Sequence, residues 1–121
     1  MRYLRMTLKD LTRKRVIAEK TVFCRSVLSQ MRGLMFSANY EDRALIMVFA
    51  KEKIVPLHMM FVFYPIDILF VDSSKKVVEL AEGAKPFVSQ IVPKHKAKYV
   101  IELAAGKIKE NRIKIGDKLQ F

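Results

Sequence analysis

Three side chains of this sequence have types that could act together in chemistry: Arg32, His58 and Asp67. The last two lie inside an otherwise apolar run that extends from Ile54 to Asp72. A carboxylate in an apolar interior is costly unless it is paired, so Asp67 requires hydrogen bonds or an ion pair. An aspartate that accepts a hydrogen bond from an imidazole can orient the ring for acid–base catalysis, and an arginine beside them could hold an anionic substrate.

The spacing of His58 and Asp67 leaves two interpretations open. They are nine residues apart, an odd number that places them on opposite faces of one straight strand. A bulge or turn at Tyr64-Pro65 would shift the register by one residue and bring both to the same side. The cluster is then either a site or a set of buried polar groups that satisfy one another. Likewise, Arg32 could bind a ligand or pin a helix to the sheet through Asp67. The structural interpretation is favoured for both pairs.

Other catalytic signals are lacking in the sequence. It has no phosphate-binding glycine loop, nucleophile elbow or dinucleotide fingerprint, and its four glycines are too few for most of them. The lone Cys24 cannot form an internal disulfide, and no cysteine and histidine spacing resembles a zinc site. We therefore expect no cofactor and no bound metal, and a reducing, cytoplasmic compartment.

Short strands separated by polar turns are the elements that would position these residues. The strands expected from the apolar and β-branched pattern are, in chain order, 3–8, 15–20, 44–50, 57–63, 66–71, 77–80, 98–103 and 113–121, with turns at 9–14, 51–53 and 72–75. The last strand is interrupted by a tight turn at Gly116-Asp117, where glycine supplies a positive φ. The two segments on either side of Pro65 are separate strands or two arms of one bent strand. A short helix is expected over 24–32, ending at Gly33, and a helical turn over 104–111.

These elements predict a fold that is mainly β, α+β at the margin: a compact β-barrel or rolled sheet with one or two short helices. At 121 residues the chain fits a single domain, residues 1–121. The apolar run has the length of a membrane span. An aspartate within a spanning helix costs about 2.5–3.5 kcal/mol on insertion scales, so covered strands are the better interpretation and we expect no membrane span. The basic start continues into charged residues, which is not the pattern of a signal peptide.

Positive charge is concentrated at the two ends of the chain. The net charge is +11: residues 1–32 have a balance of +7, residues 94–121 a balance of +5, and the middle is nearly neutral. If the two ends meet in space, they form one basic face that suits RNA, DNA or another polyanion. Only Tyr3, Tyr40 and Tyr99 lie near basic or polar sequence, so the signal for base stacking is weak. Simple solvation by lysines is the alternative interpretation.

Five motifs occur in a fixed order along the chain. They are Arg32-Gly33-Leu34-Met35-Phe36, Leu45 to Phe49, Pro65-Ile66-Asp67-Ile68-Leu69-Phe70-Val71-Asp72, Tyr99-Val100-Ile101-Glu102-Leu103 with Ala105-Gly106, and Ile113-Lys114-Ile115-Gly116-Asp117. Over about residues 14 to 121 this series resembles the family called domain of unknown function 192, also called uncharacterised protein family 0127. The resemblance implies a single compact, mainly β domain and brings no agreed activity. The positions that it matches are Arg32, Gly33, Met35, Pro65, Asp67, Gly106, Gly116 and Asp117.

The chain departs from the family pattern just before Pro65. Many members read Phe-Trp-Met-Lys-Asn-Thr where this sequence has Leu57-His58-Met59-Met60-Phe61-Val62. Three polar positions are apolar here, which puts any site built on them in doubt and leaves His58 as the main polar substitute.

The leading hypothesis is a non-enzymatic module that binds a ligand, a partner or a polyanion. It would bind through a cleft beside Arg32, His58 and Asp67, or through the basic face. One alternative is a small enzyme in which His58 is the acid or base, Asp67 orients it and Arg32 binds an anionic substrate. That alternative requires the three groups to converge on a pocket open to solvent. A structural subunit of a larger assembly is the third possibility.

Overall fold

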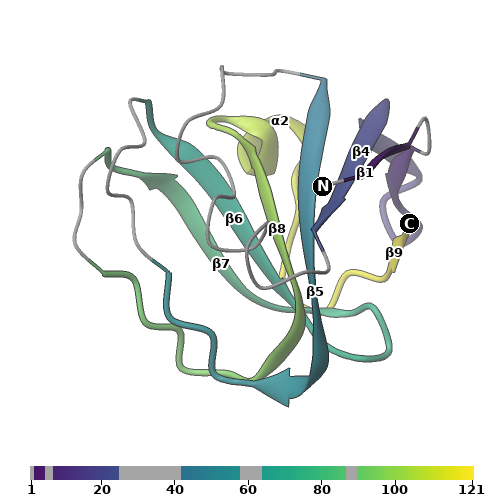
Figure 1. The fold of residues 1–121 in the computed structure, drawn as a ribbon. Coiled ribbons are helices and arrows are strands. Elements are labelled where there is room, and N and C mark those ends of the chain that lie inside the picture. Colours follow the sequence, from purple (N-terminus) through teal and green to yellow (C-terminus); the bar gives the residue numbers. More distant parts are fainter. Residues whose placement is uncertain (1, 5–6, 25–41, 58–63, 87–89) are drawn as a thin grey trace.

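The computed structural model describes residues 2–4, 7–24, 42–57, 64–86 and 90–121 (Figure 1). Its elements are β1 (Arg2–Leu4), β2 (Leu8–Asp10), β3 (Arg15–Ala18), β4 (Lys20–Cys24), β5 (Arg43–Lys53), β6 (Ile66–Val71), β7 (Val77–Ala84), β8 (Ala97–Ala104), α2 (Lys107–Asn111) and β9 (Leu119–Gln120). Sheet A has six strands in the order β1-β4-β5-β8-β6-β7, and sheet B has three in the order β3-β2-β9. The fold is mainly β, as predicted, and within the described residues it is a pair of open sheets rather than a closed barrel.

Sheet A carries a hydrophobic cluster on each face. On one face, residues such as Ile46, Leu69 and Ile101 pack with Ile17 of sheet B and Ile108 of α2. On the other face the cluster is formed by Cys24, Leu45, Met47, Val55, Ile66, Ile68, Phe70, Ala97 and Val100. Strand β6 lies between these clusters and is buried along its whole length. Burial on both faces explains why the run before Asp72 is continuously apolar.

The turn between β6 and β7 forms the hairpin that the sequence predicts. The two strands pair antiparallel, and the Asp72 carboxylate accepts hydrogen bonds from the N–H groups of Ser74 and Lys76, both at 2.9 Å. Such bonds from an aspartate to the backbone just after it are a common way to fix a turn. The hairpin is therefore determined by local sequence.

Several element bounds differ from the prediction. The expected strand 3–8 is two strands, β1 and β2, which belong to different sheets. The expected turn at 51–53 is the end of β5, where Lys53 pairs with Ala97 of β8 beyond an irregularity in the register. Of the expected final strand only β9 forms, whereas the interruption expected at Gly116 is confirmed as a turn with φ +95°. Cys24 ends β4 instead of opening a helix.

Two predicted elements cannot be compared with the structure. The remainder of the expected helix, residues 25–32, and most of the expected strand 57–63 lie outside the described residues. Among the described residues, none of the helices has the length and apolar character needed to cross a membrane.

Candidate functional site

Asp67 is buried, with 1% of its surface exposed. Its position in β6 alternates with Ile66 and Ile68, so its side chain points to the face of sheet A that α2 covers. Oδ1 accepts a hydrogen bond from the backbone N–H of Gly83 at 2.8 Å. Oδ2 accepts from the N–H groups of Gly106 at 3.1 Å and Ile108 at 2.9 Å. These charge-assisted bonds compensate for the loss of water around the carboxylate.

The bonds of Asp67 give it a structural role. The first N–H groups of a helix have no partner within the helix, and Gly106, which precedes α2, has no side chain to cap them. Asp67 supplies that cap from the neighbouring sheet. It also ties the end of β7 to the same point through Gly83. The other two predicted site residues, Arg32 and His58, lie outside the described residues, so their convergence with Asp67 stays a prediction.

The opposite face of sheet A holds a second acidic residue that the sequence analysis did not select. Glu102 lies in β8, beside Leu45 of β5 and Ile68 of β6, and is 8% exposed. It acts on Cys24, which is fully buried: burial first, and then the charge of Glu102, raise the pKa of the Cys24 thiol to about 11. A thiol that stays protonated at neutral pH is a poor nucleophile. The signal for Glu102 in the sequence was a single acidic residue within an apolar strand.

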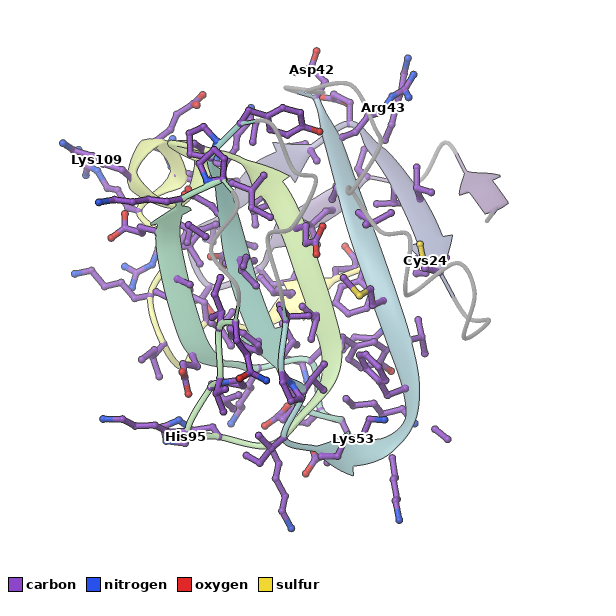
Figure 2. All side chains as sticks on the ribbon, turned by 60° about the vertical axis from the view of Figure 1, so that its left-hand side comes forward. Cys24, Asp42, Arg43, Lys53, His95 and Lys109 are labelled. Atoms are coloured by element: carbon purple, nitrogen blue, oxygen red, sulfur yellow. The ribbon has the colours of Figure 1, made fainter. Side chains whose placement is uncertain are left out.

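Cys24 and His95 do not form a thiol–imidazole pair. Figure 2 shows them on opposite sides of the molecule, with His95 at its lower edge. His95 instead bonds to Glu79, whose Oε1 lies 2.8 Å from Nδ1 of His95 and accepts from the N–H groups of Lys94 and His95. Burial acts to raise the pKa of Glu79, but these hydrogen bonds outweigh it and lower that pKa. The pair anchors a loop to β7. No cluster of three or more potential metal ligands occurs in the part of the chain that the structure describes.

The two basic ends of the chain meet in the structure. Strand β2 pairs antiparallel with β9, and Figure 1 shows the C-terminus on the same side of the molecule as the N-terminal strands. Leu11 N–H donates to the Lys118 carbonyl at 2.8 Å, and Lys118 N–H donates to Thr12 Oγ1 at 2.9 Å. The condition under which the sequence predicts one basic face is therefore met.

The turn between β6 and β7 joins the same region. Val77 N–H donates to the Asp117 carbonyl at 2.9 Å, and Leu119 N–H donates to the Lys75 carbonyl at 2.8 Å. We call the resulting surface the basic end. Its cations, all exposed except the half-buried Lys75, are Lys9, Arg13, Lys14, Arg15, Lys75, Lys76, Lys114 and Lys118.

Two buried carboxyl groups lie beneath the basic end. Asp10 is 0% exposed and Asp117 is 2% exposed. Arg13 contacts both: its N–H donates to Asp10 Oδ1 at 3.0 Å and its Nε donates to Asp117 Oδ2 at 3.1 Å. Lys114 N–H also donates to Asp117 Oδ2 at 3.1 Å. The two carboxyl groups also influence each other's ionisation.

The environment separates the pKa values of the two carboxyl groups. Burial first, and then the hydrogen bond and negative charge of Asp117, raise the pKa of Asp10 to about 6. Burial also acts to raise the pKa of Asp117, but the hydrogen bonds from Asp10, Arg13 and the Lys114 N–H outweigh it and lower that pKa. The Arg13 contact explains the asymmetry, because it favours a charged Asp117. As the pH falls, Asp10 is thus the member of the pair that is protonated first.

Exposed apolar side chains at the basic end are aliphatic. Leu11, Val16 and Ile115 are 46%, 45% and 64% exposed. The nearby ring of Phe121 already has partners: Lys75 Nζ lies 4.5 Å from its centroid, and Tyr99 packs against it edge-on with 5.0 Å between the ring centroids. A nucleic acid bound at this surface would therefore contact the cations through its phosphates more readily than it would stack its bases on aromatic rings.

Comparison with known proteins supports the resemblance found in the sequence. The family model DUF192, described as an uncharacterized ACR, matches residues 10–121. The UPF0127 protein of Thermococcus sibiricus is 33% identical over 112 residues, which cover 91% of this chain and 71% of that protein. The UPF0127 protein of Pyrococcus furiosus is 28% identical, with coverage of 93% and 95%.

Two solved structures show the same fold. A protein from Sinorhizobium meliloti, described as a candidate transcription regulator, superimposes with a TM-score of 0.84 at 24% identity and covers 94% of this chain and 89% of its own. A protein of unknown function from Novosphingobium aromaticivorans gives a TM-score of 0.83 at 23% identity, with coverage of 95% and 82%. At these identities the likeness concerns the fold alone.

Proposed function

The chain belongs to DUF192, an uncharacterised family, and from its structure we propose that it is a cytoplasmic module that binds nucleic acid by the phosphate backbone at the basic end. The observation that carries this proposal is the pairing of β2 with β9, which brings the two cation-rich ends of the chain together. A surface with several cations and few competing anions attracts a phosphate backbone.

The acidic groups at this end support the proposal by their placement. Asp10 and Asp117 are buried and bonded to Arg13, so neither carboxylate is presented to a phosphate at the surface. Because Phe121 is covered by Lys75 and Tyr99, contacts to phosphates dominate, and we expect binding to depend little on base sequence. The description of the Sinorhizobium protein as a candidate transcription regulator is compatible with a nucleic-acid partner.

The cytoplasmic part of the proposal is supported by Cys24. Its thiol is buried and takes no part in a disulfide, which suits a reducing compartment as well as a packed core. The enzyme alternative receives less support, because the described hydrogen bonds of Asp67 are made to three backbone N–H groups. A carboxylate used in this way is less available to orient an imidazole.

The test is fluorescence anisotropy with a labelled 20-nucleotide RNA and a 20-base-pair DNA, each at a series of salt concentrations. We expect binding near 50 mM salt that weakens steeply by 200 mM, because cations that contact phosphates release counterions. Absence of binding at 50 mM salt would refute the proposal.

A pair of matched variants separates the basic end from net charge. The triple variant Lys9→Glu, Arg15→Glu, Lys114→Glu changes three exposed cations of the basic end. The control, Lys51→Glu, Lys85→Glu, Lys96→Glu, changes three exposed lysines of sheet A and its loops by the same total charge. We expect the first to lose about tenfold or more in affinity at 50 mM salt and to have a smaller salt slope by about 2 to 3. Equal losses in both would show that only net charge matters and would contradict a defined surface.

A further inference from the structure

The Asp10 and Asp117 carboxyl groups join opposite ends of the chain beneath the basic end. Asp10 is the last residue of β2, and Asp117 lies in the turn that leads into β9. Both are at least 98% buried. Arg13 bridges them, through its N–H to Asp10 and its Nε to Asp117. The pair therefore belongs to the junction that creates the basic end.

One oxygen of this pair lacks a donor unless a proton is present. Asp10 Oδ2 is fully buried and accepts no hydrogen bond from an N–H or O–H group of the described residues. The side chain that interacts with the Asp10 carboxyl group, and that is joined to it through Arg13, is Asp117, which is also a carboxyl group. Two carboxylates repel and cannot bond to each other, whereas a carboxyl O–H donates to a carboxylate. A proton on Asp10 converts this unsatisfied buried oxygen into a hydrogen-bond donor. One proton is therefore enough to satisfy the buried pair.

The groups that face Asp10 give this proton an electrostatic effect. Arg15 is opposite Asp10 in β3 and has an exposed side chain, while Leu119 is opposite in β9 and is apolar. From the 112–118 segment the facing groups are the Asp117 carboxylate and the Lys114 N–H. The turn that follows β2 contributes Arg13 and the backbone of Thr12. With Asp10 protonated, Arg13 balances one carboxylate; with Asp10 ionised, it faces two.

We propose that Asp10, Asp117 and Arg13 form a proton-operated clasp that regulates the basic end, so that the protonated clasp binds a phosphate backbone more tightly than the deprotonated one. This inference rests on the proposed function. The proton leaves Asp10 Oδ2 for solvent as the pH rises, and a negative charge remains beneath the cations. Binding of a polyanion and binding of this proton then favour each other, and the coupling is reciprocal.

Polyanion affinity measured against pH tests the clasp. With a labelled 20-nucleotide RNA at constant ionic strength, we expect the wild type to bind about two- to fivefold more weakly at pH 8 than at pH 5, the range for one added charge near a surface. The variant Asp10→Asn should bind tightly at both values, because its amide N–H₂ donates to Asp117 without a proton to lose and its oxygen accepts from Arg13 N–H. A wild type without pH dependence, or a variant that keeps it, overturns the clasp.

Two further measurements keep the clasp separate from other effects. The variant His95→Gln replaces an exposed imidazole by a neutral amide, and it should leave the pH dependence unchanged; loss of the dependence in that variant would overturn the clasp. The ¹³C shift of the Asp10 carboxyl carbon in the wild type reports its titration without any polyanion. A midpoint near 6 supports the shared proton even if RNA does not bind, whereas a midpoint near 4 overturns it even if RNA binds.

Discussion

Oδ2 of Asp67 lies 2.9 Å from the backbone nitrogen of Ile108, so β6, an interior strand of sheet A, caps the first turn of α2. The same carboxylate bonds the N–H groups of Gly83 and Gly106. Three segments are thereby fixed around one buried side chain, and this arrangement explains why an aspartate can occur within a strand that is buried on both faces.

Replacement of Asp67 by alanine should destabilise the protein strongly. Three N–H groups would lose their acceptor, and that of Ile108 is buried; a buried group left unsatisfied costs roughly 1–3 kcal/mol. With the two partly buried bonds added, we expect a loss of about 3 kcal/mol in the free energy of unfolding, measured by urea denaturation.

Asp72→Ala is the matched control for that experiment. Asp72 also accepts from two backbone N–H groups and from one hydroxyl group, but its turn is open to water, which can replace the lost acceptor. We expect a loss of about 1 kcal/mol. Equal effects of the two substitutions would mean that burial of Asp67 adds nothing.

Stability should depend on pH through Asp10. Its pKa is raised from 3.8 to about 6 in the folded protein, so the folded state binds more protons than the unfolded state within that interval and stability falls as the pH rises from about 4 to 6. Asp117 has a lowered pKa, so its contribution is present above about pH 4 and is lost as the pH falls further. The pair is most stabilising near pH 4.

The variant Asp10→Asn isolates this effect. It lacks the titrating group and imitates protonated Asp10, so its stability relative to the wild type should increase from pH 4 to pH 7. A pKa difference of about two units corresponds to about 3 kcal/mol. Urea denaturation of both proteins at the two pH values measures the change, and a difference that does not vary with pH would rule out the raised pKa.

Local patterns of the sequence predicted what depends on neighbours in the chain. Strand β6 has the predicted bounds, and Asp72 forms the predicted turn, because an apolar run and a turn residue carry their own signals. Strand β5 continues through Lys51, Glu52 and Lys53 because β8 lies beside it, which no local pattern reveals.

The candidate site was predictable only in part. Asp67 was selected because a charge in an apolar run is conspicuous, but its partners are backbone N–H groups, which have no signal in the sequence. The contact between Asp10 and Asp117 was not predicted, since the two residues come from opposite ends of the chain. The basic end was predicted only under the condition that the ends meet, and the pairing of β2 with β9 fulfils it.

Cys24 should be unreactive in the folded protein. It is fully buried, and burial together with the charge of Glu102 raises the pKa of the thiol to about 11. A reagent therefore cannot reach the sulfur, and the reactive thiolate form is scarce. We expect Ellman's reagent at pH 8 to label it only on unfolding, with rapid labelling in 6 M guanidinium chloride as the control. Rapid labelling without denaturant would contradict the buried position.

Gly106 should tolerate alanine less well than Gly83, although both have open space where a Cβ would lie. The difference comes from the backbone: both glycines are left-handed, but Gly83 at φ +58° lies near the angle that other residues tolerate best, whereas Gly106 at φ +96° lies well beyond it. We expect Gly83→Ala to cost about 1 kcal/mol and Gly106→Ala up to about 3 kcal/mol, with a correspondingly lower midpoint of thermal unfolding. Because each N–H bonds to Asp67, the two variants share any effect on that carboxylate. A larger loss at Gly83 would contradict the order expected from backbone strain.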